Sequence, residues 1–282
     1  GVILITTKRG KDSPMHIDVR ANVGVNVPKA YPKYLDADCY MTMYNEACRN
    51  DGIAERYDAG TIYNTAMGTN PYRYPDIDFY SSDYLRKFYT NSDVTGEVYG
   101  GNEKTHYYLN FGMNYANSLL KYGESKKAYD MSFNVRGNVD MALASWLKAT
   151  TNAAIIFDNS YQGRGDFWGA ASTLRPNWFA PLLPIDMMDP NVAYIQEYIT
   201  NSNHLIDGKY LLGGTSADTT NPFSELLAAG YTKEKARRFM FDVAVMADLG
   251  GLLKGLSFKT AYSVDYTCLL YTSPSPRDYA AS

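Results

Sequence analysis

Apolar and polar residues alternate strictly in several long runs of the chain. In residues 16–27 every odd position is apolar, and every even position is polar or glycine. The same pattern returns in residues 107–115, 129–141 and 239–249, and no charged residue falls on the apolar register of any of these runs. Successive side chains of a β-strand point to opposite faces. Each run therefore predicts a strand with one apolar and one polar face.

The alternation predicts an all-β protein with about seven strands. Several of these strands reach the roughly 9–11 residues that a tilted strand needs to cross a bilayer. The simplest interpretation is part of an antiparallel transmembrane β-barrel, with lipid outside and water inside. The predicted strands are residues 17–27, 94–100, 105–117, 127–141, 145–157, 237–249 and 256–266.

The lengths of the connections support a barrel. Tight turns are predicted at residues 101–103, 144–146 and 250–255, whereas residues 28–93 and 158–236 form very long connections. If the strands are antiparallel, all tight turns lie at one end and all longer connections at the other, as in outer-membrane barrels. The alternative is a soluble β-sandwich, but its strands are usually near 5–6 residues long.

The two long connections contain the candidate binding residues. Residues 35–47 have an acidic start and apolar residues at helical spacing, which predicts a short amphipathic helix. Aromatic residues crowd the rest of both connections, where they could stack on sugar rings, contact a partner protein or pack the loops against one another. The candidates for substrate or partner contact are Tyr72, Tyr74, Trp168 and Trp178.

Charge and composition exclude two classes of protein. The 282-residue chain has a formal net charge of −3, and its 27 Lys and Arg residues are scattered, so no basic face for nucleic acid is expected. No apolar run approaches the roughly 20 residues of a membrane-spanning helix. The 26 tyrosines suit both membrane-interface girdles and carbohydrate-facing loops.

No catalytic, metal or cofactor site is expected. His16, His106 and His204 are far apart in sequence and show no metal-ligand spacing. The glycine-rich residues 163–169 fit no phosphate-binding motif, so a flexible loop is expected there. Nine helical residues would place Cys39 and Cys48 about 13 Å apart, which is beyond the roughly 7 Å limit of a disulfide. The sequence therefore does not predict an enzyme.

Several strings occur in the order expected of one family. Together they resemble the TonB-dependent outer-membrane transporters of the SusC/RagA type, where the first string ends the plug domain and leads into the first barrel strand. The strings are spread over nearly the whole length of residues 1–266. The strings lie at residues 1–10, 35–38, 44–47, 100–109, 221–222, 237–239, 254–259 and 264–266.

The resemblance implies a fragment of an active importer. Residues 1–13 would end the plug, and residues 14–267 would form the first strands and outer loops of a barrel of roughly 22 strands. The implied partners are a SusD-like surface lipoprotein lid and TonB, the latter through a segment missing from this chain. The implied substrate is an oligosaccharide or a peptide. The implied location is the outer membrane of a Gram-negative, Bacteroidetes-like bacterium.

The two ends of the chain look cut, and two other functions stay open. Residues 268–282 resemble translated adaptor or vector sequence and are expected to be non-native. One alternative function is a secreted soluble β-protein that binds or cleaves glycans, which would explain the loop aromatics. The other is a structural or adhesive outer-membrane barrel, which would explain the strands but not the plug-like opening.

Overall fold

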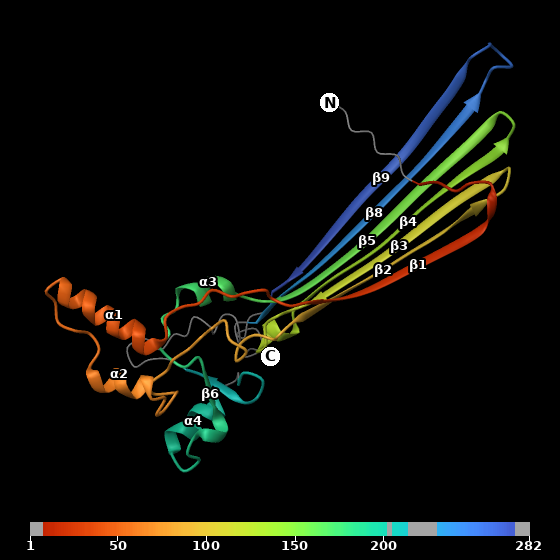
Figure 1. Ribbon diagram of the computed structural model, residues 1–282. Coiled ribbons are helices and arrows are strands. Elements are labelled where there is room, and N and C mark those ends of the chain that lie inside the picture. Colours follow the sequence, from red (N-terminus) through yellow and green to blue (C-terminus); the bar gives the residue numbers. More distant parts are fainter. Residues whose placement is uncertain (1–7, 202–204, 214–229, 274–282) are drawn as a thin grey trace.

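Seven long strands form one antiparallel sheet. The computed structural model describes residues 8–201, 205–213 and 230–273. Within this part the strand order is β1-β2-β3-β4-β5-β8-β9, and Figure 1 shows the strands side by side in a single long layer. The strands are β1 Ser13–Asn26, β2 Tyr89–Gly101, β3 Thr105–Asn117, β4 Tyr129–Ala144, β5 Leu147–Gly163, β8 Tyr231–Asp248 and β9 Ser257–Thr272.

Each strand of this sheet pairs with the next one along the chain, and the sheet does not close on itself within the described residues. The register runs from Ile17 opposite Val98 to Phe239 opposite Tyr266. These findings confirm the predicted fold class, a partial antiparallel β-barrel wall of seven strands.

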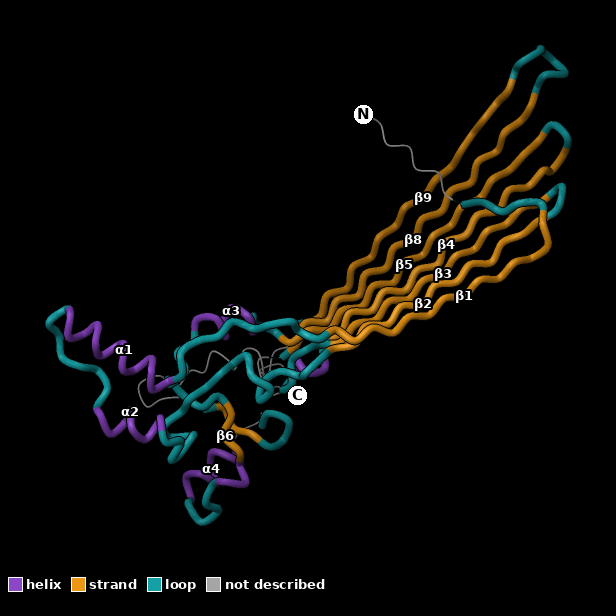
Figure 2. Tube along the Cα trace, in the orientation of Figure 1, coloured by secondary structure: helices purple, strands orange, loops and turns teal. Residues whose placement is uncertain are grey.

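Tight turns and long connections lie at opposite ends of the sheet, as predicted. The chain turns at residues 102–104, 145–146 and 249–256 at one end, and Figure 2 shows the helices gathered at the other. The β5–β8 pairing spans the connection 164–230, which leaves the sheet and returns beside the strand it left.

The described residues of the long connections contain four α-helices and a two-stranded sheet. The predicted helix is present as α1, and its buried residues Ala37, Met41, Asn45 and Cys48 follow helical spacing along one side. The helices are α1 Ala37–Asn50, α2 Ala59–Ala66, α3 Phe167–Thr173 and α4 Ala193–Asn201. The other elements are β6 Leu182–Pro184, β7 Tyr210–Leu212 and the 3₁₀ turns Glu124–Lys127 and Ile185–Met187.

The main apolar core lies among the loops rather than against the sheet. It joins the two long connections, because Phe79 and Leu85 of the first pack with Phe167 and Ile206 of the second. Backbone hydrogen bonds also link the connections, such as Ile77 N to Pro176 O at 3.0 Å. The outer loops therefore form one folded layer at the end of the sheet.

The sheet itself has one apolar face that stays exposed. Val19 and Val23 of β1 are 65% and 79% exposed, and Phe239 of β8 is 40% exposed. The register places these residues on the same face as the apolar positions of the strands between them. Apolar side chains that point away from any core are what a lipid-facing wall requires.

Some predicted strand ends are wrong. Strand β2 begins at Tyr89 rather than Val94, because backbone pairing with β1 continues where Thr90 and Ser92 make the outward register polar. Strand β9 continues past Tyr266 to Thr272 and stays paired with β8. The sequence alternation was expected to stop there, yet Cys268 and Leu270 keep the outward register.

Parts of the predicted organisation fall outside the described residues. These are residues 1–7 of the plug strand, His204, residues 221–222 and residues 274–282. The division into plug, barrel and non-native tail stays a prediction. Among the residues described, no helix is both long enough and apolar enough to cross a membrane.

Candidate functional site

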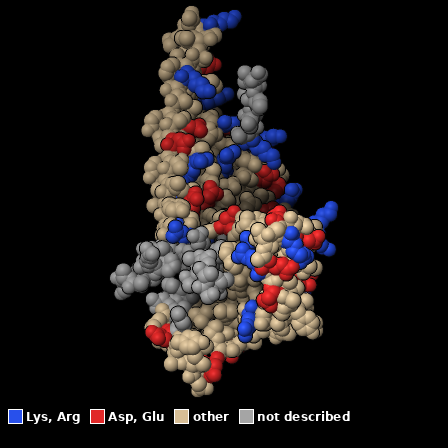
Figure 3. Space-filling view, turned by 90° about the vertical axis from the view of Figure 1, so that its left-hand side faces the viewer, with Lys and Arg blue, Asp and Glu red and all other residues tan. Residues whose placement is uncertain are grey.

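The polar register of the strands forms a continuous hydrogen-bonded surface on the inner face of the sheet. The Tyr108 hydroxyl of β3 donates to Glu97 Oε2 of β2 at 2.7 Å. Asn152 Nδ2 of β5 donates to Asp242 Oδ2 of β8 at 2.6 Å. Figure 3 shows acidic and basic side chains mixed along the sheet. This face therefore offers water and solutes both signs of charge.

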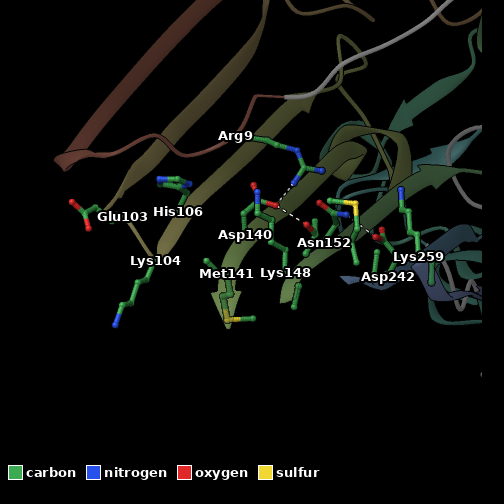
Figure 4. A pocket seen from close by; sticks show the side chains of 16 residues that line it. Arg9, Glu103, Lys104, His106, Asp140, Met141, Lys148, Asn152, Asp242 and Lys259 are labelled. Atoms are coloured by element: carbon green, nitrogen blue, oxygen red, sulfur yellow. Dashed lines mark hydrogen bonds and ion pairs between the residues drawn. The ribbon is translucent and has the colours of Figure 1, made fainter. Parts of the chain in front are cut away.

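The chain that precedes β1 lies on this inner face. Lys8 Nζ is 3.1 Å from Glu97 Oε2, and Arg9 Nη1 is 2.6 Å from Asp140 Oδ1 on β4. The Thr150 hydroxyl donates to the same Asp140 oxygen at 2.8 Å. Figure 4 shows Arg9 and Asp140 pointing toward each other. Residues that are far apart in sequence thus meet on the wall.

Backbone contacts hold the same segment close to the wall. Asn138 Nδ2 donates to the Lys8 carbonyl at 3.0 Å, and Asn138 is only 5% exposed. A Cβ on Gly10 would lie 2.4 Å from Tyr107 N, so the approach of the chain to β3 requires glycine there. The lysine and arginine ion pairs are partly exposed, and such pairs contribute little to stability. The two ion pairs therefore orient residues 8 and 9 on the sheet but add little to the stability of the contact.

An open hollow adjoins Arg9 at the turn end of the wall. Its charged lining includes Asp140, Lys148, Asp242 and Lys259, which come from four different strands. The labelled side chains in Figure 4 surround this space. The lining of the hollow therefore offers both positive and negative groups to a polar solute.

The predicted loop aromatics of the first connection lie in a turn at the outer end. Tyr72 is 37% exposed, and Tyr74 is half-buried with Arg73 Cζ 5.5 Å from its ring centroid. Asn70 Oδ1 shapes the turn by accepting from the backbone amides of Tyr72 at 3.0 Å and Arg73 at 3.1 Å. The Tyr72 ring is available for contact.

The two predicted tryptophans combine loop packing with exposure. The Trp168 ring centroid is 6.0 Å from that of Tyr80 and 5.1 Å from that of Phe167, yet Trp168 is 44% exposed. Trp178 is 40% exposed and lies 5.6 Å from the buried Phe179, measured between ring centroids. Their packing against the loops agrees with one alternative from the sequence. Their role in recognition stays a prediction.

The environment shifts the pKa values of two side chains in the outer loops, Asp76 and Tyr84. Burial raises the pKa of Asp76, and the hydrogen bond that it accepts from Ala37 N at 2.8 Å opposes this shift. Burial also raises the pKa of Tyr84, next to Phe79 in the loop core. Both groups serve loop structure, since Asp76 fixes the start of α1.

Sequence reasoning missed the contacts of the inner wall. Arg9 and Asp140 are 131 positions apart, and nothing in the alternation links a basic residue before the first strand with one acidic residue on the fourth. The sequence shows only that acidic residues recur on the polar register of the strands. It does not show which of them Arg9 contacts. His16 stacks on Tyr99, with ring centroids 5.1 Å apart, and no cluster of potential metal ligands occurs in the described part of the chain.

Comparison with known proteins identifies the fold. No protein-family model matches the chain, and no curated protein matches it by sequence. Solved structures that resemble it include the following two. One is the RagAB peptide importer in the "closed-closed" state, with a TM-score of 0.57 and 16% identity. The other is the RagAB peptide transporter, with a TM-score of 0.60 and 15% identity.

This chain has a fold similar to part of those RagAB chains. Each match covers 95% of this chain and 30% of the RagAB chain, so the described strands and loops correspond to under a third of that protein. The agreement extends over both the sheet and the outer loops. It is consistent with the resemblance of the sequence strings to SusC/RagA-type transporters.

Proposed function

We propose that this chain is part of the barrel of a TonB-dependent outer-membrane transporter of the SusC/RagA type. The observation that carries the proposal is the division of the sheet into two faces. One face is apolar and exposed, and the other is polar, charged and contacted by the preceding chain. A wall between lipid and a water-filled lumen needs this division.

The contacts of residues 8–10 support the active-transport part of the proposal. In the proposed transporter these residues join the plug to the barrel. The pairs Lys8–Glu97 and Arg9–Asp140 are exposed enough to break and re-form at low cost when TonB pulls on the plug. These pairs would position the junction between plug and barrel and would still allow the plug to move.

The outer loops are the proposed surface for substrate and lid. Tyr72, Tyr74, Trp168 and Trp178 lie in the loop layer, and the tryptophans stay about 40% exposed while packed on one side. Rigid, half-exposed aromatics suit contact with a sugar, a peptide or a partner protein. A SusD-like surface lipoprotein is the proposed lid, and the RagAB match favours peptide over oligosaccharide as substrate.

A secreted soluble protein that binds or cleaves glycans is the second candidate. The exposed loop aromatics favour it. However, a soluble sheet needs a second layer over its apolar face, and the described residues place none there, since Val19, Val23 and Val25 are all more than half exposed. The transporter reading accounts for this face and the soluble one does not.

The test uses the full-length protein that contains this chain, expressed in its own outer membrane. Replacing all four loop aromatics with alanine is expected to slow growth on the imported nutrient, supplied as peptide or as oligosaccharide, and to weaken association with the lid. The matched control is Trp146→Ala, because Trp146 is 53% exposed in the β4–β5 turn at the opposite end. Unchanged growth together with unchanged association would remove these residues from the site.

A further inference from the structure

The outward face of the sheet carries three charges, and all of them lie on β8. The register of the seven described strands puts Lys233, Lys235 and Arg237 on the same face as Phe239 and the rest of the apolar register. The lysines and arginines elsewhere in these strands, such as Arg238 and Lys259, fall on the inner register. A charge on the lipid-facing register is costly at the bilayer centre and tolerable near an interface.

Aromatic residues mark this end of β8 as the membrane interface. Tyr161 of β5 stacks on Tyr231 at 4.6 Å and on Tyr129 at 6.1 Å, measured between ring centroids. Tyr129 stacks in turn on Tyr115 at 6.0 Å. Tyrosine girdles of this kind lie at head-group level in outer-membrane barrels. Strand β8 starts at the loop end (Figure 1), so the three charges lie at the outer leaflet.

The neighbours on this face supply no carboxylate. Opposite the three residues on β5 lie Tyr161, Asn159 and Phe157, and this side carries the argument. The opposite positions on β9 are Thr272, Leu270 and Cys268, which belong to the segment 268–282 that the sequence predicts to be non-native. No ion pair in the described part of the chain includes Lys233, Lys235 or Arg237. Glu124 accepts a hydrogen bond from the Tyr161 hydroxyl, but it already pairs with Lys127 at 3.0 Å.

The arginine is held in position by the protein. Its guanidinium lies over the Phe157 ring, with Cζ 4.9 Å from the centroid. Arg237 Nη2 donates to Asn159 Oδ1 at 2.8 Å, and Nη1 donates to the Asp158 carbonyl at 3.1 Å. Alternate residues of a strand are about 6.8 Å apart. The three positive groups therefore form a ladder along the strand that two or more anionic oxygens of one head group can bridge.

We propose that Lys233, Lys235 and Arg237 bind the phosphate of an anionic outer-leaflet lipid. The inference rests on the proposed location in an outer membrane. Among the described residues, the strand positions opposite these three offer no anion, and Glu124 is already engaged by Tyr161 and Lys127, so we assign the anion to the surrounding lipid. A phosphorylated glycolipid fits best, since the guanidinium and ammonium groups can bind its phosphate while the tyrosines contact its sugar and upper acyl region.

The test measures lipid binding by the full-length transporter purified in detergent. Native mass spectrometry with added phosphorylated lipid A, and with its dephosphorylated form, compares the wild type with a variant that combines Lys233→Gln, Lys235→Gln and Arg237→Gln. Binding of the phosphorylated form is expected to weaken about fivefold for each basic side chain removed. Binding of the dephosphorylated form is expected to be weak in both proteins.

Two further variants keep the result interpretable. The combination of Lys148→Gln, Arg238→Gln and Lys259→Gln removes three charges from the inner face and is expected to leave lipid binding unchanged. The charge-preserving set Lys233→Arg, Lys235→Arg and Arg237→Lys is expected to retain binding. Heat-shifted mobility on gels shows that each variant has formed its barrel.

Equal binding of phosphorylated lipid by the wild type and the glutamine variant would overturn the proposal, and would mean that the three side chains reach up to water instead. Equal binding of the two lipid forms by the wild type would overturn it as well. Failure of the proposed function would be seen in a different measurement, because the wild type would then import no nutrient, whatever lipid it binds.

Discussion

A single buried amide fastens the first helix of the outer loops to the chain that follows it. Asn45 is 3% exposed on α1, and its Nδ2 donates to the Tyr57 carbonyl at 2.7 Å. Its Oδ1 accepts from the backbone amides of Arg56 at 3.1 Å and Tyr57 at 3.0 Å. The sequence places Asn45 on a helix but gives no sign that its partners lie eleven and twelve residues later.

Asn45→Ala is therefore expected to loosen this part of the loop layer. The change leaves the partly buried backbone groups of Arg56 and Tyr57 without their side-chain partner, which costs about 1 kcal/mol because water replaces it only in part. Hydrogen exchange of the amides of residues 53–58, measured by mass spectrometry in the full-length protein, is expected to speed up accordingly. Met43→Ala is the control, because Met43 lies on the same helix and is 58% exposed. Equal exchange in both variants would mean that Asn45 does not hold the loop.

The start of α2 gives a prediction about pH. Asp58 Oδ1 accepts from the Thr61 amide at 2.8 Å, and hydrogen bonds from the Thr61 side chain and backbone lower the pKa of Asp58 below its ordinary value. Because the folded-state pKa is lowered, the cap stabilises α2 above the ordinary pKa and is lost as pH falls through the lowered value. Exchange of the Thr61 amide, divided by the intrinsic rate of an unprotected amide at the same pH, is expected to rise below about pH 4.

Asp58→Asn serves as the comparison, since an amide oxygen caps a helix without titrating. The Thr61 amide of this variant is expected to show no such acid-dependent increase. The same increase in both proteins would assign the effect to another group.

The strands were the most predictable elements of the molecule. One face of each strand is apolar and the other is polar, so the residues alternate with a period of two that can be recognised in the sequence. Val135 and Val243 fall on the apolar register in the sequence and on the outward face in the sheet. The helices α2, α3 and α4 and the small sheet β6–β7 were not predicted. They are short, so tertiary packing stabilises them more than any local pattern does. Helix α2 packs on α1, and Phe167 and Ala171 of α3 pack in the loop core with Phe79.

An arginine scan separates the two faces of one strand. Val243→Arg is expected to destabilise the barrel by about 2–4 kcal/mol near the bilayer midplane, because the charge enters lipid. Ala244→Arg puts the same side chain into the polar hollow and is expected to be mild by comparison. Urea unfolding of the full-length protein in lipid vesicles measures both, with Val135→Arg and Asn134→Arg as a second matched pair. Equal effects on the two faces would rule out a lipid-facing register.

At the scale of the whole molecule, the sheet and the loop layer do different work. In the proposed transporter the sheet separates lipid from water, whereas the loop layer folds around its own core of Phe79, Leu85, Phe167 and Ile206. The lengths of the connections, together with antiparallel strands, predicted that the long loops lie at one end of the sheet and the tight turns at the other. The sequence did not predict that the two long connections pack together, or that residues 8–10 lie on the sheet. Both depend on contacts between residues that are far apart in sequence.

The measurement that tests the central claim most directly is a spin-label scan of β4 in the full-length protein, reconstituted in lipid with its native cysteines replaced. Single labels at residues 132–139 would be read for collisions with oxygen, which concentrates in lipid, and with a water-soluble nickel complex. A barrel wall predicts that the two signals alternate with a period of two and in opposite phase, with Phe133 and Val135 toward oxygen and Asn134 and Arg136 toward nickel. Two signals that rise and fall together would contradict the account, because both faces of the strand would then meet the same solvent.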